Sequence, residues 1–287
     1  MKFLSDVLKI AYLGPGGSYC EMAKDEFLDK YDFYPMEEHF NMISRVIDFV
    51  DETPFAVGVI PLENSIEGTV RESSDNLIKT KNPNIRILSE FVIPIKHCLL
   101  SKVTELYSIT GVISHPQALA QCHDFISTKL PMNVSIIKAS STAEAAKSLD
   151  GYNLTYSAIG SKKTAQLYNL NIICENINDD PTNQTRFALI GDVDTPVTGN
   201  DKTSIAFSTE NKSGALLEIL EIFSKYNINL SYIDSRPSKT KFGEYTFHVD
   251  FDGHVLDEPI KLAIEEIKNK VKFFRSFGSY EKFVSKE

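Results

Sequence analysis

The sequence predicts an α/β protein in which a large region of alternating strands and helices is followed by a small βαββαβ domain. Short apolar, partly β-branched runs alternate with helical patterns over the first two-thirds of the chain, which is typical of α/β folds with substantially parallel sheets. Residues 191–202, GDVDTPVTGNDK, show no periodicity and are rich in Gly, Asp, Thr and Pro, which indicates a linker. The strand and helix order beyond them predicts a small antiparallel sheet with both helices on one face.

The large region is expected to form two α/β lobes. The run 85–100, IRILSEFVIPIKHCLL, is long and strand-like enough to carry the chain from one lobe to the other. A return crossing is expected near 170–185. The predicted strands of this region are residues 8–13, 55–60, 110–114, 133–138, 156–160 and 186–190.

Capping boxes mark two helix starts in the large region, since Ser18 is followed by Glu21 and Ser141 by Glu144. The small domain has a clear order of elements. They are strand 203–208, helix 214–226, strands 229–235 and 243–251, helix 256–269 and strand 271–277.

Composition excludes several classes of protein. The chain has 287 residues, of which 42% are hydrophobic and 24% are charged. Its net charge is −9, and no run of Lys and Arg residues forms a basic stripe. A nucleic-acid partner is therefore not expected, because such binding rests largely on phosphate neutralisation. No apolar run reaches the roughly 18 residues of a membrane span, and Ser5, Asp6 and Lys9 interrupt any signal-peptide core. A cytoplasmic protein with reduced thiols is expected, because the cysteines are scattered; they are Cys20, Cys98, Cys122 and Cys174.

The first candidate site is the stretch 55–70, FAVGVIPLENSIEGTV, in which polar residues follow a buried strand. In a structural interpretation, Asn64 and Ser65 cap a helix and Gly68 forms a turn. In a functional interpretation, Glu63, Asn64 and Ser65 lie at the carboxyl end of a strand, where open α/β sheets bind ligands. An amide and a hydroxyl there suit a small molecule that carries carboxylates and hydroxyls. The stretch alone leaves both interpretations open.

A glycine-rich turn, LGPGGSYCEMA, precedes the first capped helix. The backbone N–H groups of Gly16, Gly17 and Ser18 could face an anion there. The segment matches neither G-x-G-x-x-G nor the P-loop, so nucleotide binding is not indicated and a tight turn is the simpler interpretation.

Three further motifs are ambiguous by themselves. Thr185 and Arg186 in DDPTNQTRFALIG precede an apolar strand, where the arginine could pair with a structural carboxylate. His115 and His123 in SHPQALAQCHDF lack a third metal ligand, which favours structural roles. In SGALLEILEIF, Gly214 lets a ligand carboxylate approach the helix start, or simply follows an N-cap serine.

The order and spacing of these motifs resemble the prephenate dehydratase family. GPGGSYCEMA, VIPLENSIEGTV, SHPQALAQC and NQTRF follow one another as in its catalytic region, and GALLEIL followed by DSRP is similar to the ACT domain that senses phenylalanine. The resemblance runs from about residue 8 to about residue 280. It implies a catalytic region at 1–191 with two lobes like type II periplasmic binding proteins, a linker at 192–202 and a ferredoxin-like ACT domain at 203–287. No chorismate mutase segment precedes these motifs, so the monofunctional form is expected.

The resemblance also implies a reaction. In this family prephenate loses water and CO₂ to give phenylpyruvate, in phenylalanine biosynthesis, without a metal or organic cofactor. Thr185 of T-R-F is implied as the donor to the departing hydroxyl. Because a threonine hydroxyl is a poor acid, we expect it to act by hydrogen bonding, tuned by Glu63. The implied substrate-binding residues are Asn64, Ser65, Gly68, Ser18, Ser141, Thr142, Arg186 and Phe187.

Phenylalanine is implied as an allosteric effector, bound between ACT domains of a homodimer or homotetramer. The sequence departs from the family pattern at Cys20, where a hydroxyl residue is common, and at Asp234, which replaces the longer acid of E-S-R-P. The effector contacts implied by the motifs are Gly214, Ala215, Leu216, Asp234, Ser235, Arg236 and Pro237.

Two other functions fit the same motifs. An arogenate dehydratase performs the same chemistry on the amino analogue of the substrate, and relative kcat/KM values distinguish the two. A non-catalytic amino-acid sensor could combine a cleft with an ACT domain, but it need not keep Thr185, Asn64 and Ser65 together.

Overall fold

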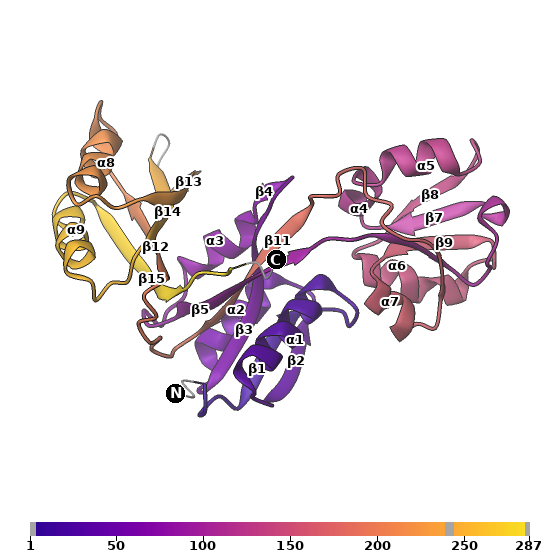
Figure 1. Ribbon diagram of the computed structural model, residues 1–287, viewed down its shortest axis with the longest axis horizontal. Helices are drawn as coiled ribbons and strands as arrows, with labels where there is room; N and C mark the ends of the chain where they lie inside the picture. Colours follow the sequence, from indigo (N-terminus) through magenta and orange to yellow (C-terminus); the bar gives the residue numbers. More distant parts are fainter. Residues whose placement is uncertain (1–3, 239–243, 285–287) are drawn as a thin grey trace.

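The computed structural model describes residues 4–238 and 244–284. It contains three sheets, which belong to two α/β lobes and a C-terminal domain, with the first lobe in the middle (Figure 1). The chain leaves the first lobe through residues 95–97 and returns from the second through 175–183. We call these segments the outward and return crossings.

The first lobe is built on a mixed sheet. In spatial order its strands are β2 (Met36–Phe40), β1 (Lys9–Leu13), β3 (Ala56–Asn64), β11 (Gln184–Gly191) and β5 (Arg86–Pro94), with β4 (Gly68–Thr69) paired to β3. Its helices are α1 (Tyr19–Tyr31), α2 (Ile43–Glu52) and α3 (Arg71–Leu77). The first three strands of the chain are parallel, whereas β11 is antiparallel to β3 and β5. This reversal arises because β11 enters the sheet from the second lobe.

The helices of the first lobe cover its sheet through regularly spaced apolar residues. In α2, Ile43, Val46, Ile47 and Val50 are buried, which is the spacing of one helix face. The helix packs closely on β3 because Gly58 has no side chain, and a Cβ there would lie 2.8 Å from Val50.

The second lobe has a five-stranded mixed sheet. Its strands, in spatial order, are β10 (Asn171–Cys174), β6 (Cys98–Ser101), β9 (Tyr156–Gly160), β7 (Gly111–Ser114) and β8 (Ser135–Lys138). Its helices are α4 (Pro116–Ala120), α5 (His123–Lys129), α6 (Thr142–Ser148) and α7 (Lys162–Leu167), with short 3₁₀ turns η1 (Leu106–Ser108) and η2 (Leu149–Gly151).

The C-terminal domain is the predicted βαββαβ unit. Its antiparallel sheet has the order β13 (Leu230–Pro237), β14 (Tyr245–Asp252), β12 (Asp201–Ser208) and β15 (Phe273–Glu281), and α8 (Ala215–Lys225) and α9 (Glu258–Lys268) lie on one face. The opposite face lies toward the first lobe (Figure 1). Residue 243, at the start of one predicted strand, lies outside the described residues.

The predicted fold class is confirmed, with corrections in detail. The strand β3 continues through Asn64 and forms a hairpin with β4, so the helix-cap interpretation of Asn64 and Ser65 is wrong. The strands β2, β4 and β10 were not predicted. All four cysteines are free.

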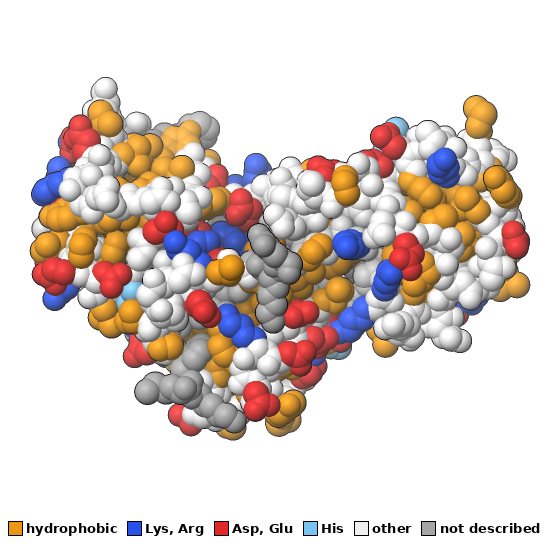
Figure 2. Space-filling model, in the orientation of Figure 1, with side chains coloured by type: hydrophobic (Ala, Val, Ile, Leu, Met, Phe, Trp, Pro, Cys, Tyr) orange, Lys and Arg blue, Asp and Glu red, His pale blue; other side chains and the backbone are white. Residues whose placement is uncertain are grey.

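The surface agrees with the charge pattern of the sequence. Acidic and basic side chains are interspersed on the face shown, without a continuous basic stripe (Figure 2). Within residues 4–238 and 244–284, none of the helices has the length and apolar character needed to cross a membrane.

Candidate active site

The candidate site forms where β3 pairs with β11. Thr185 lies opposite Asn64, Arg186 opposite Glu63, and Phe187 opposite Pro61. The register shifts by one residue between the last two pairs, so β3 carries one extra residue there. This bulge brings Pro61 and Asn64 to the same face, although they are three positions apart and a regular strand would place them on opposite faces.

That face borders a cleft of about 250 Å³ between the two lobes. The first lobe contributes side chains from β1, α1, β3 and β11, and the second contributes the starts of α4 and α6. Among the described residues that line the cleft, none is Lys, Arg, Asp or Glu. The polar and aromatic residues around it are Tyr19, Asn64, His97, His115, Gln117, Gln121, Ser140, Ser141, Thr142, Thr185 and Phe187.

The side chains of Thr185 and Asn64 are hydrogen-bonded to each other at the floor of this cleft. Asn64 Nδ2 donates to Thr185 Oγ1 over 2.9 Å, and both side chains are buried. The Asn64 Oδ1 atom accepts the backbone N–H groups of Ile66 and Glu67 at 3.1 and 3.0 Å. The threonine oxygen is therefore an acceptor in this pair, which leaves its own proton available to another acceptor.

Ser65 and Gly68 belong to the hairpin rather than to the cleft lining. Ser65 is exposed, and its hydroxyl oxygen accepts the backbone N–H of Gln184 over 3.0 Å. Gly68 closes the turn opposite Asn64 with φ +80°, a conformation that favours glycine.

Arg186 and Glu63 lie on the face of the sheet opposite to Thr185. Arg186 is within 3.4 Å of Glu63, 3.2 Å of Glu90 and 2.7 Å of Asp250, which belongs to the C-terminal domain. Burial disfavours the charged guanidinium, but Asp250 and Glu90 outweigh it and raise the pKa of Arg186. The structure thus places Arg186 at the domain junction and keeps Glu63 on that side, away from Thr185.

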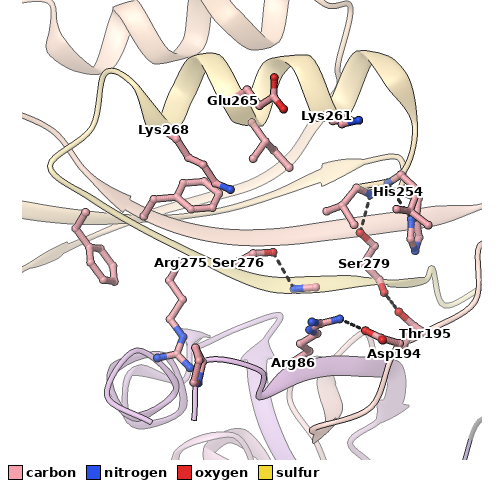
Figure 3. Close-up of a pocket in the computed structure, with 17 residues that line it drawn as sticks. Arg86, Asp194, Thr195, His254, Lys261, Glu265, Lys268, Arg275, Ser276 and Ser279 are labelled. Atoms are coloured by element: carbon pink, nitrogen blue, oxygen red, sulfur yellow. Dashed lines mark hydrogen bonds and ion pairs between the residues drawn. The ribbon is translucent and has the colours of Figure 1, made fainter. Parts of the chain in front are cut away.

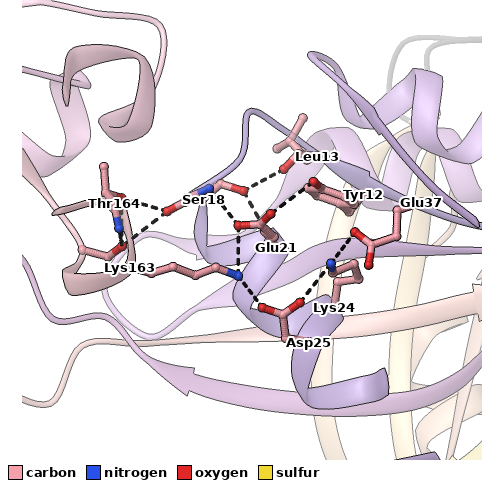
Figure 4. A network of polar contacts seen from close by, with 11 residues as sticks. Tyr12, Leu13, Ser18, Glu21, Lys24, Asp25, Glu37, Lys163 and Thr164 are labelled. Carbon is pink, nitrogen blue, oxygen red and sulfur yellow. Dashed lines mark hydrogen bonds and ion pairs between the residues drawn. The ribbon is translucent and has the colours of Figure 1, made fainter. Parts of the chain in front are cut away.

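The N–H group of the glycine-rich turn binds a carboxylate of the protein itself, that of Glu21. Gly17 N–H donates to Glu21 Oε2 over 2.8 Å, while Ser18 Oγ accepts from the N–H of Glu21 and donates to Leu13 O (Figure 4). Burial opposes the charged form of Glu21, but the Gly17 N–H and Lys163 outweigh it and lower the pKa. Glu21 therefore takes the place of an external anion, which agrees with the tight-turn interpretation, and Ser18, implied as a substrate-binding residue, does not line the cleft.

The same turn touches the second lobe. Thr164 Oγ1 and Ser161 Oγ both donate to Gly17 O, at 2.9 and 3.3 Å. Lys163 pairs with Glu21 at 2.9 Å and also with Asp25 (Figure 4). These contacts fix the spacing of the two lobes on one side of the cleft.

Ser141 and Thr142 enter the cleft from the second lobe. Ser141 is the N-cap of α6, where its oxygen accepts the N–H of Glu144 over 3.0 Å and keeps its proton for another partner. His115 caps α4 in the same way, with Nδ1 accepting the N–H of Gln117, and burial lowers its pKa.

The residues missed at the sequence level are His97, Gln121 and Asn183. Gln121 Oε1 accepts from Asn183 Nδ2 at 3.0 Å and lies 3.2 Å from His97 Nε2. Burial lowers the pKa of His97, so its ring is neutral at pH 7. Gln121 and Asn183 lie within the motifs SHPQALAQC and NQTRF, but nothing in their spacing indicated that the fold would join them.

A larger groove, of about 830 Å³, lies between β15, α9 and the first lobe (Figure 3). Both of its arginines already have partners, since Arg86 pairs with Asp194 and Arg275 donates to the carbonyls of Ile78, Thr80 and Asn82. The interlobe cleft is the better candidate because it holds Thr185 and Asn64. In the part of the chain that the structure describes, no group of three or more His, Cys, Asp or Glu side chains could hold a metal ion.

The effector motifs lie on two elements of the C-terminal domain. Gly214 precedes α8 with φ +82°, and Ala215 and Leu216 form the first turn. Along β13 the burial alternates, so Asp234 and Arg236 are half-buried while Ser235 and Pro237 are exposed. Arg236 reaches Asp75 of α3 at 3.5 Å.

Comparison with known proteins gives a consistent picture. The family model described as prephenate dehydratase matches residues 10–195, and that described as ACT domain matches 203–269. A prephenate dehydratase of Methanocaldococcus jannaschii is 40% identical over 280 residues, covering 96% of this chain and 98% of its own. A bifunctional chorismate mutase/prephenate dehydratase of Aquifex aeolicus is 39% identical, covering 99% of this chain and 76% of its own. The crystal structure of a prephenate dehydratase from Arthrobacter aurescens, in complex with L-Phe, has a TM-score of 0.86 at 29% identity and covers 96% of this chain and 90% of its own.

Proposed function

The chain belongs to the prephenate dehydratase family, and from this membership we propose that it converts prephenate to phenylpyruvate in the interlobe cleft, with Thr185 as the donor to the leaving hydroxyl. Prephenate carries a doubly allylic hydroxyl across the ring from a carboxylate. Loss of that hydroxyl with CO₂ makes the ring aromatic, so the driving force lies in the substrate. The protein has to orient the dianion and stabilise the departing oxygen.

The bond from Asn64 to Thr185 is the observation that carries this assignment. Thr185 Oγ1 accepts a hydrogen bond from Asn64 Nδ2, so the threonine can still donate its own proton. The residue lines the cleft, where a substrate oxygen could accept that proton. A positioned donor of this kind stabilises negative charge as it develops on oxygen. Asn64 itself makes all its hydrogen bonds within the protein, so we assign it to orienting Thr185 rather than to holding the substrate.

The substrate carboxylates need other partners. We assign them to the hydroxyls and N–H groups at Ser141 and Thr142, which face the cleft from the second lobe. Phe187 offers an apolar surface beside Thr185 for the ring. Arg186 and Glu63 are left out of substrate binding because they pair with each other on the other face of the sheet.

The test is turnover of prephenate by the purified protein, followed as phenylpyruvate formation. Thr185→Ala should lower kcat by roughly 10²–10⁴-fold with a smaller change in KM, and Thr185→Ser should recover most of that loss because it restores a hydroxyl. A fully active Thr185→Ala enzyme contradicts the assignment. The ratio of kcat/KM for prephenate and arogenate decides between the two substrates, and turnover of neither would favour a sensor.

We assign phenylalanine as the effector, bound where Gly214–Leu216 of one ACT domain meet the Asp234–Pro237 strand of a second copy. The Arthrobacter aurescens relative has L-Phe bound, and β13 is an edge strand on which Ile233 is 46% exposed. An edge with exposed apolar residues favours pairing with another chain. Calorimetry with phenylalanine, together with light scattering of the full chain, tests this: absence of binding heat, or a monomer that binds phenylalanine, would exclude the shared site.

A further inference from the structure

The backbone determines which end of the Asn64 amide is its oxygen. Two N–H groups, of Ile66 and Glu67, point at Oδ1, and a backbone N–H can only donate. The other end of the amide is therefore the NH₂ group. It faces three acceptors, which are Asn183 Oδ1 at 2.8 Å, Thr185 Oγ1 at 2.9 Å and Gln184 O at 3.1 Å.

This orientation determines the next members of the chain of hydrogen bonds. Because Asn183 Oδ1 accepts from Asn64, its Nδ2 faces Gln121 Oε1, 3.0 Å away. The same oxygen lies 3.2 Å from His97 Nε2, which therefore carries the proton of the neutral ring. We call Asn64, Asn183, Gln121 and His97 the amide relay.

The amide relay connects the two crossings between the lobes. Asn183 belongs to the return crossing and is 1% exposed, and His97 belongs to the outward crossing and is 3% exposed. Gln121 follows α4 of the second lobe, and its carbonyl accepts the N–H of Asp179 in the return crossing. The direction of the Thr185 hydroxyl is thus connected, bond by bond, to both crossings and to the opposite lobe.

We propose that Asn183 is a positioning residue of the dehydratase reaction, acting through Asn64 on Thr185, and that Gln121 holds it in place. By accepting one N–H of Asn64, Asn183 leaves the other for Thr185 Oγ1, so the threonine proton turns toward the cleft. Without the Asn183 oxygen, the NH₂ end of the Asn64 amide can tilt, while Oδ1 keeps its backbone partners, so that an N–H turns from Thr185 toward the competing Gln184 carbonyl. This inference rests on the proposed role of Thr185, and the experiment below separates the two.

The experiment is a double-mutant cycle on kcat, with Asn183→Leu and Thr185→Ala alone and combined. Leucine has the same number of side-chain heavy atoms as asparagine, branched at the same carbon, and removes both of its hydrogen bonds. We expect Asn183→Leu alone to lower kcat by roughly 10- to 100-fold, the effect of a misplaced reacting group, with little change in KM. In the Thr185→Ala background it should cause no further loss, because it acts through the missing hydroxyl.

The matched control is Asn178→Leu in the same crossing, where the side chain contacts the His97 N–H and the Ile95 carbonyl but not Asn64. Any loss it causes should be equal in both backgrounds. If Asn183→Leu lowers kcat by the same factor in the Thr185→Ala background as in the wild type, the positioning role is overturned while the role of Thr185 stands. A fully active Thr185→Ala enzyme overturns both.

A second variant guards against a folding defect. In Asn183→Asp, a carboxylate can accept from Asn64 but cannot donate to Gln121 Oε1, whereas the protonated acid can do both. We therefore expect kcat of this variant to fall as pH rises through the pKa of the new carboxyl, an ionisation absent from the wild-type profile. A variant whose kcat profile has the wild-type shape would overturn the proposal.

Discussion

Arg186 of β11 and Asp250 of β14 form a 2.7 Å ion pair across the junction between the first lobe and the ACT domain. The preceding residue, Thr185, faces the cleft on the other side of the same strand. The proposed hydroxyl donor is therefore adjacent in the chain to a residue that contacts the ACT domain. Tyr232 completes the junction, because its ring lies 5.6 Å from the Arg186 guanidinium and its backbone is in register with Asp250.

The first prediction concerns communication between the effector site and the cleft. The Asp250→Asn change removes one of the three carboxylates that pair with Arg186, the one that belongs to the ACT domain, but keeps the size of the side chain. We expect phenylalanine to bind with a Kd within a few-fold of wild type, while its effect on kcat/KM shrinks strongly, because coupling requires a contact that both sites influence. Calorimetry measures the first quantity, and initial rates with and without phenylalanine measure the second.

The control for that prediction lies two residues further along the same strand. Asp252→Asn makes the same chemical change, but Asp252 pairs with Lys282 at 2.7 Å within the ACT domain. Its regulation should remain that of wild type. Wild-type regulation in Asp250→Asn would exclude a route through this ion pair.

The local pattern of the sequence was enough to predict most strands and the order of the three units. It failed for β2, MEEHF, because four of its five residues are exposed, so neither an apolar run nor an alternation marks it. It also failed at residues 61–64, PLEN. The strand continues through these polar residues because a bulge changes which way their side chains face and a hairpin pairs them with β4. Such features depend on the partner strand, which no local pattern reveals.

The sequence was enough to predict which strands form the candidate site, but not which side chains face the cleft. Thr185 and Asn64 were singled out, and the structure pairs them directly. The motif left open whether Arg186 pairs with a structural carboxylate or with the substrate, and no local pattern pointed to Asp250, 64 residues away, as that carboxylate. The alternation of a strand predicts that consecutive residues face apart, but only the packing of the ACT domain decides what each face meets.

The second prediction concerns acid stability. Burial lowers the pKa of His97, His115 and His248 below the ordinary value of 6.5. Below pH 6.5 the unfolded chain therefore binds protons that the folded chain does not, so the free energy of unfolding should fall as the pH drops. Thermal melts between about pH 5 and 8 measure this. His248→Gln should flatten the dependence, whereas exposed His123→Gln should not; an unchanged Tm across this range would contradict the prediction.

The third prediction concerns the turn that touches the second lobe. Gly17 has φ +86°, and a Cβ there would lie 3.2 Å from Thr164 Oγ1. Gly17→Ala should therefore lower the free energy of unfolding by roughly 1–3 kcal/mol, measured by urea denaturation. Gly151→Ala is the matched control, since φ is not positive there and no atom lies within 4 Å of the added carbon. Equal stability of the two variants would show that the turn tolerates a side chain.

The last prediction concerns the spacing of the lobes. Lys163 of α7 pairs with Glu21 and Asp25 of α1, whereas the adjacent Lys162 pairs at 2.6 Å with Glu175, which follows β10 of its own lobe. Lys163→Met removes the charged link between lobes, so a smaller fraction of molecules holds the cleft at its binding distance and KM for prephenate should rise by roughly 2- to 5-fold. The kcat value should change less, because Thr185 and the amide relay are untouched. Lys162→Met loses a pair of similar geometry without crossing the cleft, so its KM should stay at the wild-type value. A KM rise of equal size in both variants would mean that general charge loss, rather than lobe spacing, weakens binding.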